Sequence, residues 1–121
     1  MRVIIDLIED VREQIGNHET YEVMAGLLKT DARDSEKLIY AGEAPLNTVD
    51  LEREKRQLRF KIDGSDKKLT IGELIPSILI LDMEAMLFEL KMDVNAQYKD
   101  MEIVGFGKND AQKRYILFIK I

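Results

Sequence analysis

The single histidine, His18, is the only side chain whose ordinary pKa lies near neutral pH, so it is the first candidate for acid–base chemistry. A hydrolase-type triad also needs a carboxylate that orients the imidazole and a nucleophile within its reach. His18 follows a predicted helix and precedes Glu19 in a predicted exposed turn. Because this setting supplies neither requirement, we predict no catalytic residue.

Metal chemistry would have to use carboxylates, because the sequence contains no cysteine. The lack of cysteine also excludes disulfides, zinc thiolate sites, iron–sulfur clusters and thiol nucleophiles. Asp31 with Asp34, and Asp63 with Asp66, are close in sequence, but neither pair has the ligand spacing of a calcium loop. Aspartates in short polar runs are typical of turns. We therefore expect no metal and no cofactor.

The run Gly105-Phe106-Gly107-Lys108 has the residue types of a phosphate-binding loop. Such a loop leads from a strand into the N-terminus of a helix. Here a second strand is predicted to follow. The glycines therefore predict a bulge or a hairpin turn instead.

Positive charges concentrate between residues 53 and 68. If residues 57–62 and 67–71 form a hairpin, several of these charges project from one surface and could hold an anion. The alternative interpretation is an edge hairpin that its charges protect from aggregation. Phe60 is the only aromatic residue here, which argues against single-stranded nucleic acid, because that ligand needs stacking platforms. The candidate anion-binding residues are Arg56, Arg59, Lys61, Lys67 and Lys68.

The overall charge is acidic, with a net charge of -5 and a pI of about 5.0. Nucleic-acid backbones and anionic membranes attract clustered Lys and Arg, so we expect neither as a partner. The longest apolar run, residues 78–81, is far too short to span a membrane. Met1-Arg2 leads into alternating apolar and acidic residues rather than a signal peptide, so we expect a cytoplasmic protein.

The helical signals are two amphipathic segments. Residues 3–15 place apolar side chains on one face, and Gly16-Asn17 supplies a stop. Thr70-Ile71-Gly72-Glu73 fits a capping box, which predicts that a second helix begins there and runs to about Lys91. Pro76 lies near its first turn, where it costs little.

The remaining apolar segments predict a mostly antiparallel sheet of about five strands. Residues 20–30 suit a strand or a helix, and we favour a strand because Gly26 weakens a helix. The segment 115–119 is apolar on both faces, which predicts a central strand. Further strands are predicted over residues 38–41, 57–62, 68–71 and 102–106. The chain is thus predicted to be one α+β domain over residues 1–121, in the order α-β-β-β(β)-α-β-β.

The second predicted helix carries two apolar strips, whereas a helix packed on one sheet needs one. The first helix could cover the second strip. Alternatively, the narrower strip is an interface with a second copy or another protein, because a closed two-fold dimer is the commonest way to cover such a patch. The candidate interface residues are Leu74, Ile78, Leu81, Ala85 and Phe88.

The order of elements, the acidic charge and the size resemble those of the secretion-chaperone-like domains over most of the chain. Type III secretion chaperones are the best-known members of that group of small acidic dimers, which hold an extended client segment. The resemblance includes no specific residues, and the final helix usual in that group is missing from this sequence.

Three functional hypotheses follow. The first is a non-enzymatic interaction module, a homodimer that binds another protein. The second is a small-ligand or anion-binding domain that uses the basic stretch 53–68. The third is an enzyme that relies on carboxylates or backbone groups which the sequence does not reveal.

Overall fold

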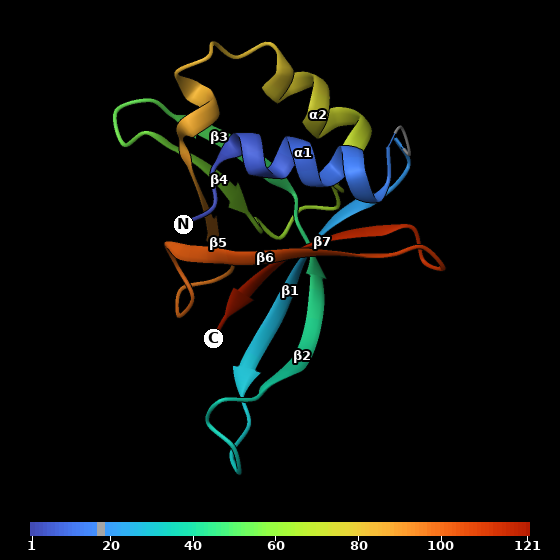
Figure 1. The fold of residues 1–121 in the computed structure, drawn as a ribbon, viewed down its shortest axis with the longest axis vertical. Helices are drawn as coiled ribbons and strands as arrows, with labels where there is room; N and C mark the ends of the chain where they lie inside the picture. The colour runs from blue at the N-terminus through green and yellow to red at the C-terminus, as the bar shows by residue number, and fades with distance from the viewer. Residues whose placement is uncertain (17–18) are drawn as a thin grey trace.

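The structure, a computed structural model, describes residues 1–16 and 19–121 and contains two α-helices and seven strands (Figure 1). The helices are α1 (Ile4–Gln14) and α2 (Ile71–Leu79), and a short 3-10 helix, η1 (Ala85–Leu87), follows α2. The strands are β1 (Glu22–Thr30), β2 (Leu38–Pro45), β3 (Thr48–Glu52), β4 (Gln57–Lys61), β5 (Glu89–Asp93), β6 (Met101–Asn109) and β7 (Arg114–Lys120). The predicted α+β class and the rough order of elements are confirmed.

All seven strands belong to one sheet in the order β2-β1-β7-β6-β5-β4-β3. The pairs β1–β7 and β4–β5 are parallel, and the other pairs are antiparallel. The predicted sheet of about five strands is therefore too small, and the sheet is mixed. Strand β3 is an additional strand, in a segment for which the sequence pattern predicted none. The predicted strand over residues 68–71 is reduced to a single bridge between Thr70 and Glu22.

Helix α1 follows the predicted amphipathic pattern. Ile4, Leu7 and Val11 on one face are buried. The Asp6 carboxylate accepts a hydrogen bond of 2.8 Å from the backbone N–H of Val3, which satisfies one donor at the helix N-terminus. The helix ends before Gly16, whose φ of 58° is the left-handed conformation expected at that stop.

The second predicted helix begins where expected, since Thr70 Oγ1 accepts a hydrogen bond from Glu73 N–H. Its predicted end near Lys91 is wrong, because α2 ends at Leu79. Asp82 Oδ1 then accepts from the backbone of Ala85 and starts the 3-10 turn. Phe88 adopts an extended conformation, and β5 follows. In β5, buried and half-buried side chains alternate as in a strand, but the same apolar residues also fit a helical period, so the sequence predicted a helix here.

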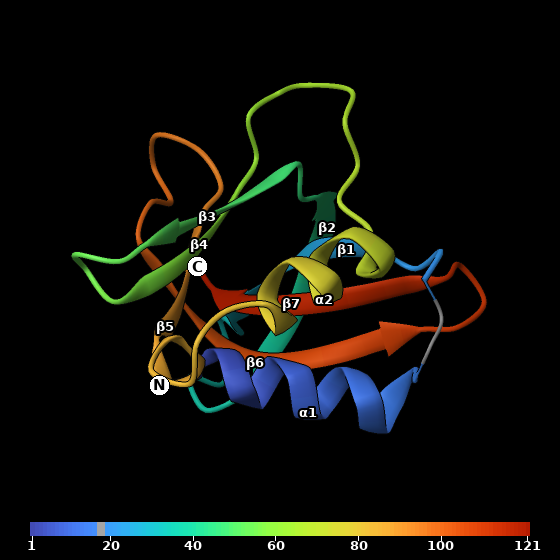
Figure 2. The same ribbon diagram turned by 90° about the horizontal axis from the view of Figure 1, so that it is seen from above.

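Both helices lie on the same side of β6 and β7 (Figures 1 and 2). Side chains from the helices and from that face of the sheet form one apolar core. Its fully buried members include Ile4, Phe60, Leu74, Tyr115 and Leu117. Strand β7 lies centrally between β1 and β6, as its apolar sequence predicted. None of the helices in the described ranges is long and apolar enough to cross a membrane.

The opposite face of the sheet carries an aromatic ring in close contact with two glycines. A Cβ built on Gly26 would lie 2.6 Å from both Ile116 Cγ2 and Phe118 Cδ1, and one built on Gly107 would lie 2.7 Å from Phe118 Cε2. The Phe118 ring thus occupies the space that side chains on β1 and β6 would fill. A third glycine, Gly105, has open space at its Cβ position.

These contacts predict that Gly26→Ala lowers the free energy of unfolding by about 1–3 kcal/mol, because the added methyl group displaces Ile116 and Phe118. The matched substitution Gly105→Ala on β6 meets no atom within 4 Å and is expected to be neutral. Urea unfolding of the two variants and the wild type measures the difference. Equal midpoints for both variants would contradict the packing described.

Candidate functional site

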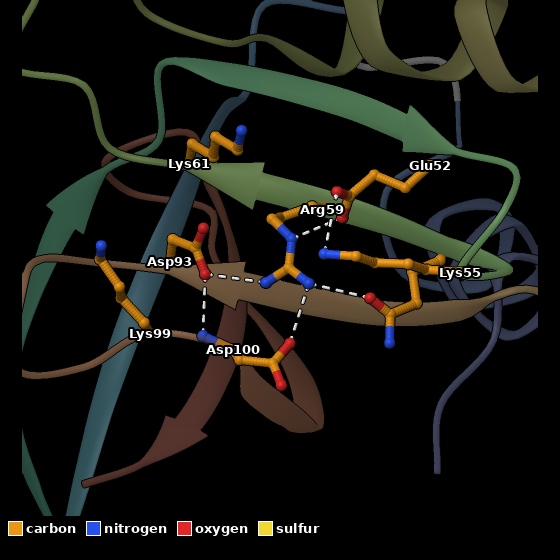
Figure 3. A pocket seen from close by; sticks show the side chains of 8 residues that line it. Glu52, Lys55, Arg59, Lys61, Asp93, Lys99 and Asp100 are labelled. Atoms are coloured by element: carbon orange, nitrogen blue, oxygen red, sulfur yellow. Dashed lines mark hydrogen bonds and ion pairs between the residues drawn. The ribbon is translucent and has the colours of Figure 1, made fainter.

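The most concentrated group of charges surrounds Arg59 on β4, whose side chain is only 7% exposed (Figure 3). Its Nε donates to Glu52 at 2.6 Å, and its Nη1 donates to Asp93 at 2.8 Å. Its Nη2 donates to both Gln57 and Asp100 at 2.8 Å. Every nitrogen of the guanidinium therefore has a partner within the chain. We call these five residues the Arg59 cluster.

The sheet itself positions this cluster. Along β4, Leu58 and Phe60 point into the core, so Arg59 between them points to the opposite face. Glu52 on β3 and Asp93 on β5 project from the two neighbouring strands. Asp100 comes from the loop after β5, where its N–H donates to the Asp93 carboxylate at 2.8 Å. The cluster therefore ties three strands and one loop together.

Arg59 changes the acidity of its partners. Its hydrogen bonds hold the pKa of the Glu52 and Asp100 carboxyls below their ordinary values, although partial burial opposes this. Burial of the guanidinium disfavours its charge, but hydrogen bonds from Arg59 to Glu52, Asp100 and Asp93 outweigh burial and raise the pKa of Arg59 above its ordinary value. Glu52, Asp100 and Arg59 are therefore charged at neutral pH.

A shallow hollow of about 410 Å³ lies over the cluster, and Lys55, Lys61 and Lys99 lie on its rim (Figure 3). Lys55 is 3.7 Å from Glu52, and Lys61 is 3.0 Å from Asp50. Among the described residues no buried side-chain polar atom lacks a hydrogen-bond partner, and no three acidic or histidine groups gather as metal ligands. The arrangement holds strands β3, β4 and β5 together through charge-assisted hydrogen bonds.

The five candidate anion-binding residues do not form one site. Arg56 is 2.7 Å from Glu84 and its guanidinium lies 5.3 Å from the centre of the Phe88 ring. Lys67 and Lys68 pair with Glu73 and Glu22 at 3.9 and 3.5 Å. Of the five, only Arg59 and Lys61 line the hollow. Each cation has an acidic neighbour, so the structure adds no support for an anion site here.

The candidate interface residues also lie elsewhere than a surface strip requires. Leu74, Ile78, Ala85 and Phe88 are all buried in the chain's own core, and Leu81 is half-buried. Helix α2 ends at Leu79. Ala85 and Phe88 therefore reach the core from the 3-10 turn that follows, and not from the face of a continuous helix. This strip is therefore not available to a partner in the structure described.

A different set of apolar side chains is exposed around the same segment. Leu79, Ile80, Met83 and Leu87 are 48%, 84%, 90% and 64% exposed. We call them the α2 surface. The excess of apolar residues in this segment was visible in the sequence, but which of them face outward depends on where the helix stops. A second exposed set on β2 consists of Leu38, Ile39 and Tyr40.

The other sequence motifs have structural roles. Residues 105–108 lie within β6 and pair with β7, so the glycines do not form a hairpin turn, and the register shift between Ile103 and Gly105 matches the predicted bulge. Lys108 Nζ donates to the Gln14 carbonyl at 2.9 Å. The Asp31, Asp34 and Asp63 carboxylates each accept from the backbone N–H two residues later, as predicted for turns. His18 lies outside the described residues, so its prediction stays a prediction.

The Tyr115 hydroxyl on β7 donates to Asp10 on α1 at 2.5 Å. Burial, and then this hydrogen bond, raise the pKa of Tyr115 above its ordinary value. The contact joins the first helix to the central strand.

Comparison with models of known families, with curated proteins and with solved structures gives no match in any of the three. The functional argument therefore depends on the residues of this chain.

The Arg59 cluster predicts that Arg59→Met lowers the free energy of unfolding by about 2 kcal/mol or more, because three carboxylates are left without their common cation. The control is Arg53→Met, since the Arg53–Asp82 pair spans 3.4 Å with both side chains 57% exposed. Breaking such an exposed pair is expected to cost less than about 1 kcal/mol. Urea unfolding at pH 7 compares them, and equal losses would contradict a structural role for the cluster.

The lowered pKa values of Glu52 and Asp100 predict a dependence on pH. These two carboxylates stabilise the folded state fully above the pKa of roughly 4 that they have in the unfolded chain. This stabilisation is lost as the pH falls through their lower pKa values in the folded state. The stability difference between wild type and Arg59→Met is therefore largest at neutral pH and shrinks below about pH 4. Unfolding curves collected at intervals between neutral and strongly acidic pH measure it. A difference that stays constant across this range would mean that Arg59 does not act through these carboxylates.

Proposed function

We propose that the chain is a non-enzymatic protein-interaction module that binds another protein through the α2 surface. The observation that carries the proposal is the exposure of Leu79, Ile80, Met83 and Leu87 within one short segment. Burying apolar surface is worth roughly 25 cal/mol per Å². Clustered exposure of this kind is typical of a surface that a partner covers.

The segment is held in place, so its apolar side chains cannot simply fold inward. Leu81, Ala85 and Phe88 anchor it to the core from within. Backbone hydrogen bonds from Leu81 to Ile78 and from Leu87 to Glu84 fix its turns. Because the inward side chains of this segment are packed in the core, Leu79, Ile80, Met83 and Leu87 remain exposed to solvent.

The charges around the α2 surface suggest the chemistry of the partner. Arg53 pairs with Asp82, and Arg56 pairs with Glu84, so the rim presents both signs of charge in balanced pairs. A charge-balanced rim around an apolar centre is the usual composition of a protein interface. Met83 adds an adaptable side chain that can fit varied contacts. We expect an aliphatic segment of another protein as the partner.

This proposal predicts that the triple substitution Ile80→Ser, Met83→Ser and Leu87→Ser abolishes partner binding but leaves stability within about 1 kcal/mol of wild type, because the side chains are exposed. Peptides selected on the wild-type protein from a displayed random library serve as partners, and fluorescence anisotropy measures their affinity. The selected peptides are expected to be rich in aliphatic residues.

The control for this experiment is Leu38→Ser with Tyr40→Ser, which removes exposed apolar side chains from β2 instead. The control should retain peptide binding. The proposal fails if the selected peptides bind the triple variant as tightly as the wild type.

A further inference from the structure

Strand β2 is an edge of the sheet whose exposed end is apolar. Leu38, Ile39 and Tyr40 are 44%, 38% and 47% exposed, and Ala41 beside them is exposed too. This end belongs to the β1–β2 hairpin, which extends past β6 and β7 away from the helices (Figure 1). Successive side chains of a strand point to opposite faces, so β2 is apolar on both faces here.

The backbone of this end has free hydrogen-bonding groups. The N–H of Asp31 donates to the carbonyl of Lys37 at 2.9 Å, and Lys29 lies opposite Ile39. Hydrogen-bonded and non-hydrogen-bonded residue pairs alternate in an antiparallel ladder. Lys37 and Ile39 therefore direct their backbone N–H and C=O groups toward β1. Leu38 and Tyr40 therefore direct their N–H and C=O groups outward. Within the described ranges, no strand lies beyond β2 in the sheet.

The opposite edge of the same sheet is protected. Strand β3 carries Asp50 and Glu52, which pair with Lys61 and Arg59 on β4. Charged side chains on an edge strand discourage pairing with another chain. The molecule thus blocks one edge and leaves the other edge apolar and uncharged from Leu38 to Ala41.

We infer that a second copy of this chain pairs with β2 in the antiparallel direction, with the two-fold axis at Ile39. Leu38 then lies opposite Tyr40 of the second copy, and the reciprocal pair forms by symmetry. The two pairs exchange four backbone hydrogen bonds, and the sheets of both copies become continuous. The inference shares with the proposed function the premise that the chain acts through protein contacts, but it concerns a different surface.

The chemistry of the strand favours a second copy as the occupant. In this register Lys37 lies opposite Ala41, and Glu36 lies opposite Gly42, so no charge faces a like charge across the axis. Tyr40 packs edge-on against Phe118 with ring centres 6.2 Å apart, and Leu38 of the second copy extends that apolar strip. Antiparallel pairing of the projecting hairpins directs the two bodies toward opposite ends of the paired strands.

A disulfide tests the register directly, because the natural sequence contains no cysteine. In the proposed pairing Ile39 faces itself as a non-bonded pair, with a Cα–Cα distance of about 4.5 Å, which a disulfide can bridge. Ile39→Cys should therefore give a covalent dimer under mild oxidation. The matched variant Ile80→Cys, on the exposed α2 surface, should stay monomeric on denaturing gels. Equal cross-linking of the two variants would overturn the register.

Sedimentation velocity over a range of micromolar concentrations tests the association itself. The wild type should sediment as a dimer, and Leu38→Lys with Tyr40→Lys should weaken self-association by about tenfold or more, because like charges then meet across the axis. The control Ile80→Lys should remain a dimer. A strictly monomeric wild type that still binds its selected peptides would overturn this inference alone. Unchanged peptide binding after loss of the α2 surface would overturn only the proposed function.

Discussion

The parallel pairing of β4 with β5 is the constraint on which the outer surface of this molecule depends. Gln57 lies opposite Glu89, so the chain must return to the starting end of β4 before β5 begins. Strand β4 has five residues and α2 has nine. At 3.3 Å per strand residue and 1.5 Å per helical residue, these lengths are about 17 Å and 14 Å. Helix α2 is thus about as long as β4, and it begins beside β1, where Thr70 bridges Glu22.

A helix that continued to Lys91 would be about 30 Å long and would take up residues that form β5. The chain instead leaves the helix at Leu79 and travels to β5 through a turn and η1. This turn separates the apolar residues of the segment into a buried group and an exposed group. Leu74, Ile78 and Phe88 enter the core, whereas Ile80 and Met83 remain outside. The exposed apolar surface is therefore a consequence of the crossover geometry.

Local patterns in the sequence identified the elements whose signals are local. The amphipathic period and terminal glycine identified α1, the capping box identified the start of α2, alternation identified β4, and the run of apolar residues 115–119 identified β7. The sequence did not predict the end of α2 at Leu79, because the spacing of Leu90 and Met92 fits a helix as well as a strand. Parallel pairing of β1 with β7 leaves no local signal, since the partners are distant in sequence.

The role of Arg59 was equally invisible for a physical reason. Glu52 lies seven positions before Arg59, but its partners Asp93 and Asp100 lie 34 and 41 positions further along the chain, so the local sequence does not show that three carboxylates surround its charge. A run of cations looks like an attractive surface for anions until the acidic side chains from other strands are in place. Arg56 and Lys68 also have acidic neighbours from distant parts of the sequence, Glu84 and Glu22, whereas Lys61 and Lys67 pair with the closer Asp50 and Glu73.

The position of strand β7 in the sheet also determines how this chain folds. It pairs with β1 on one side and with β6 on the other, and its partner β1 comes from the opposite end of the sequence. Joining such distant segments carries a large loop-closure entropy, which slows folding compared with folds built from neighbouring segments. Until β7 is inserted, β1 and β2 form an isolated hairpin, which has little stability in water. The molecule is therefore expected to fold slowly and in one cooperative step.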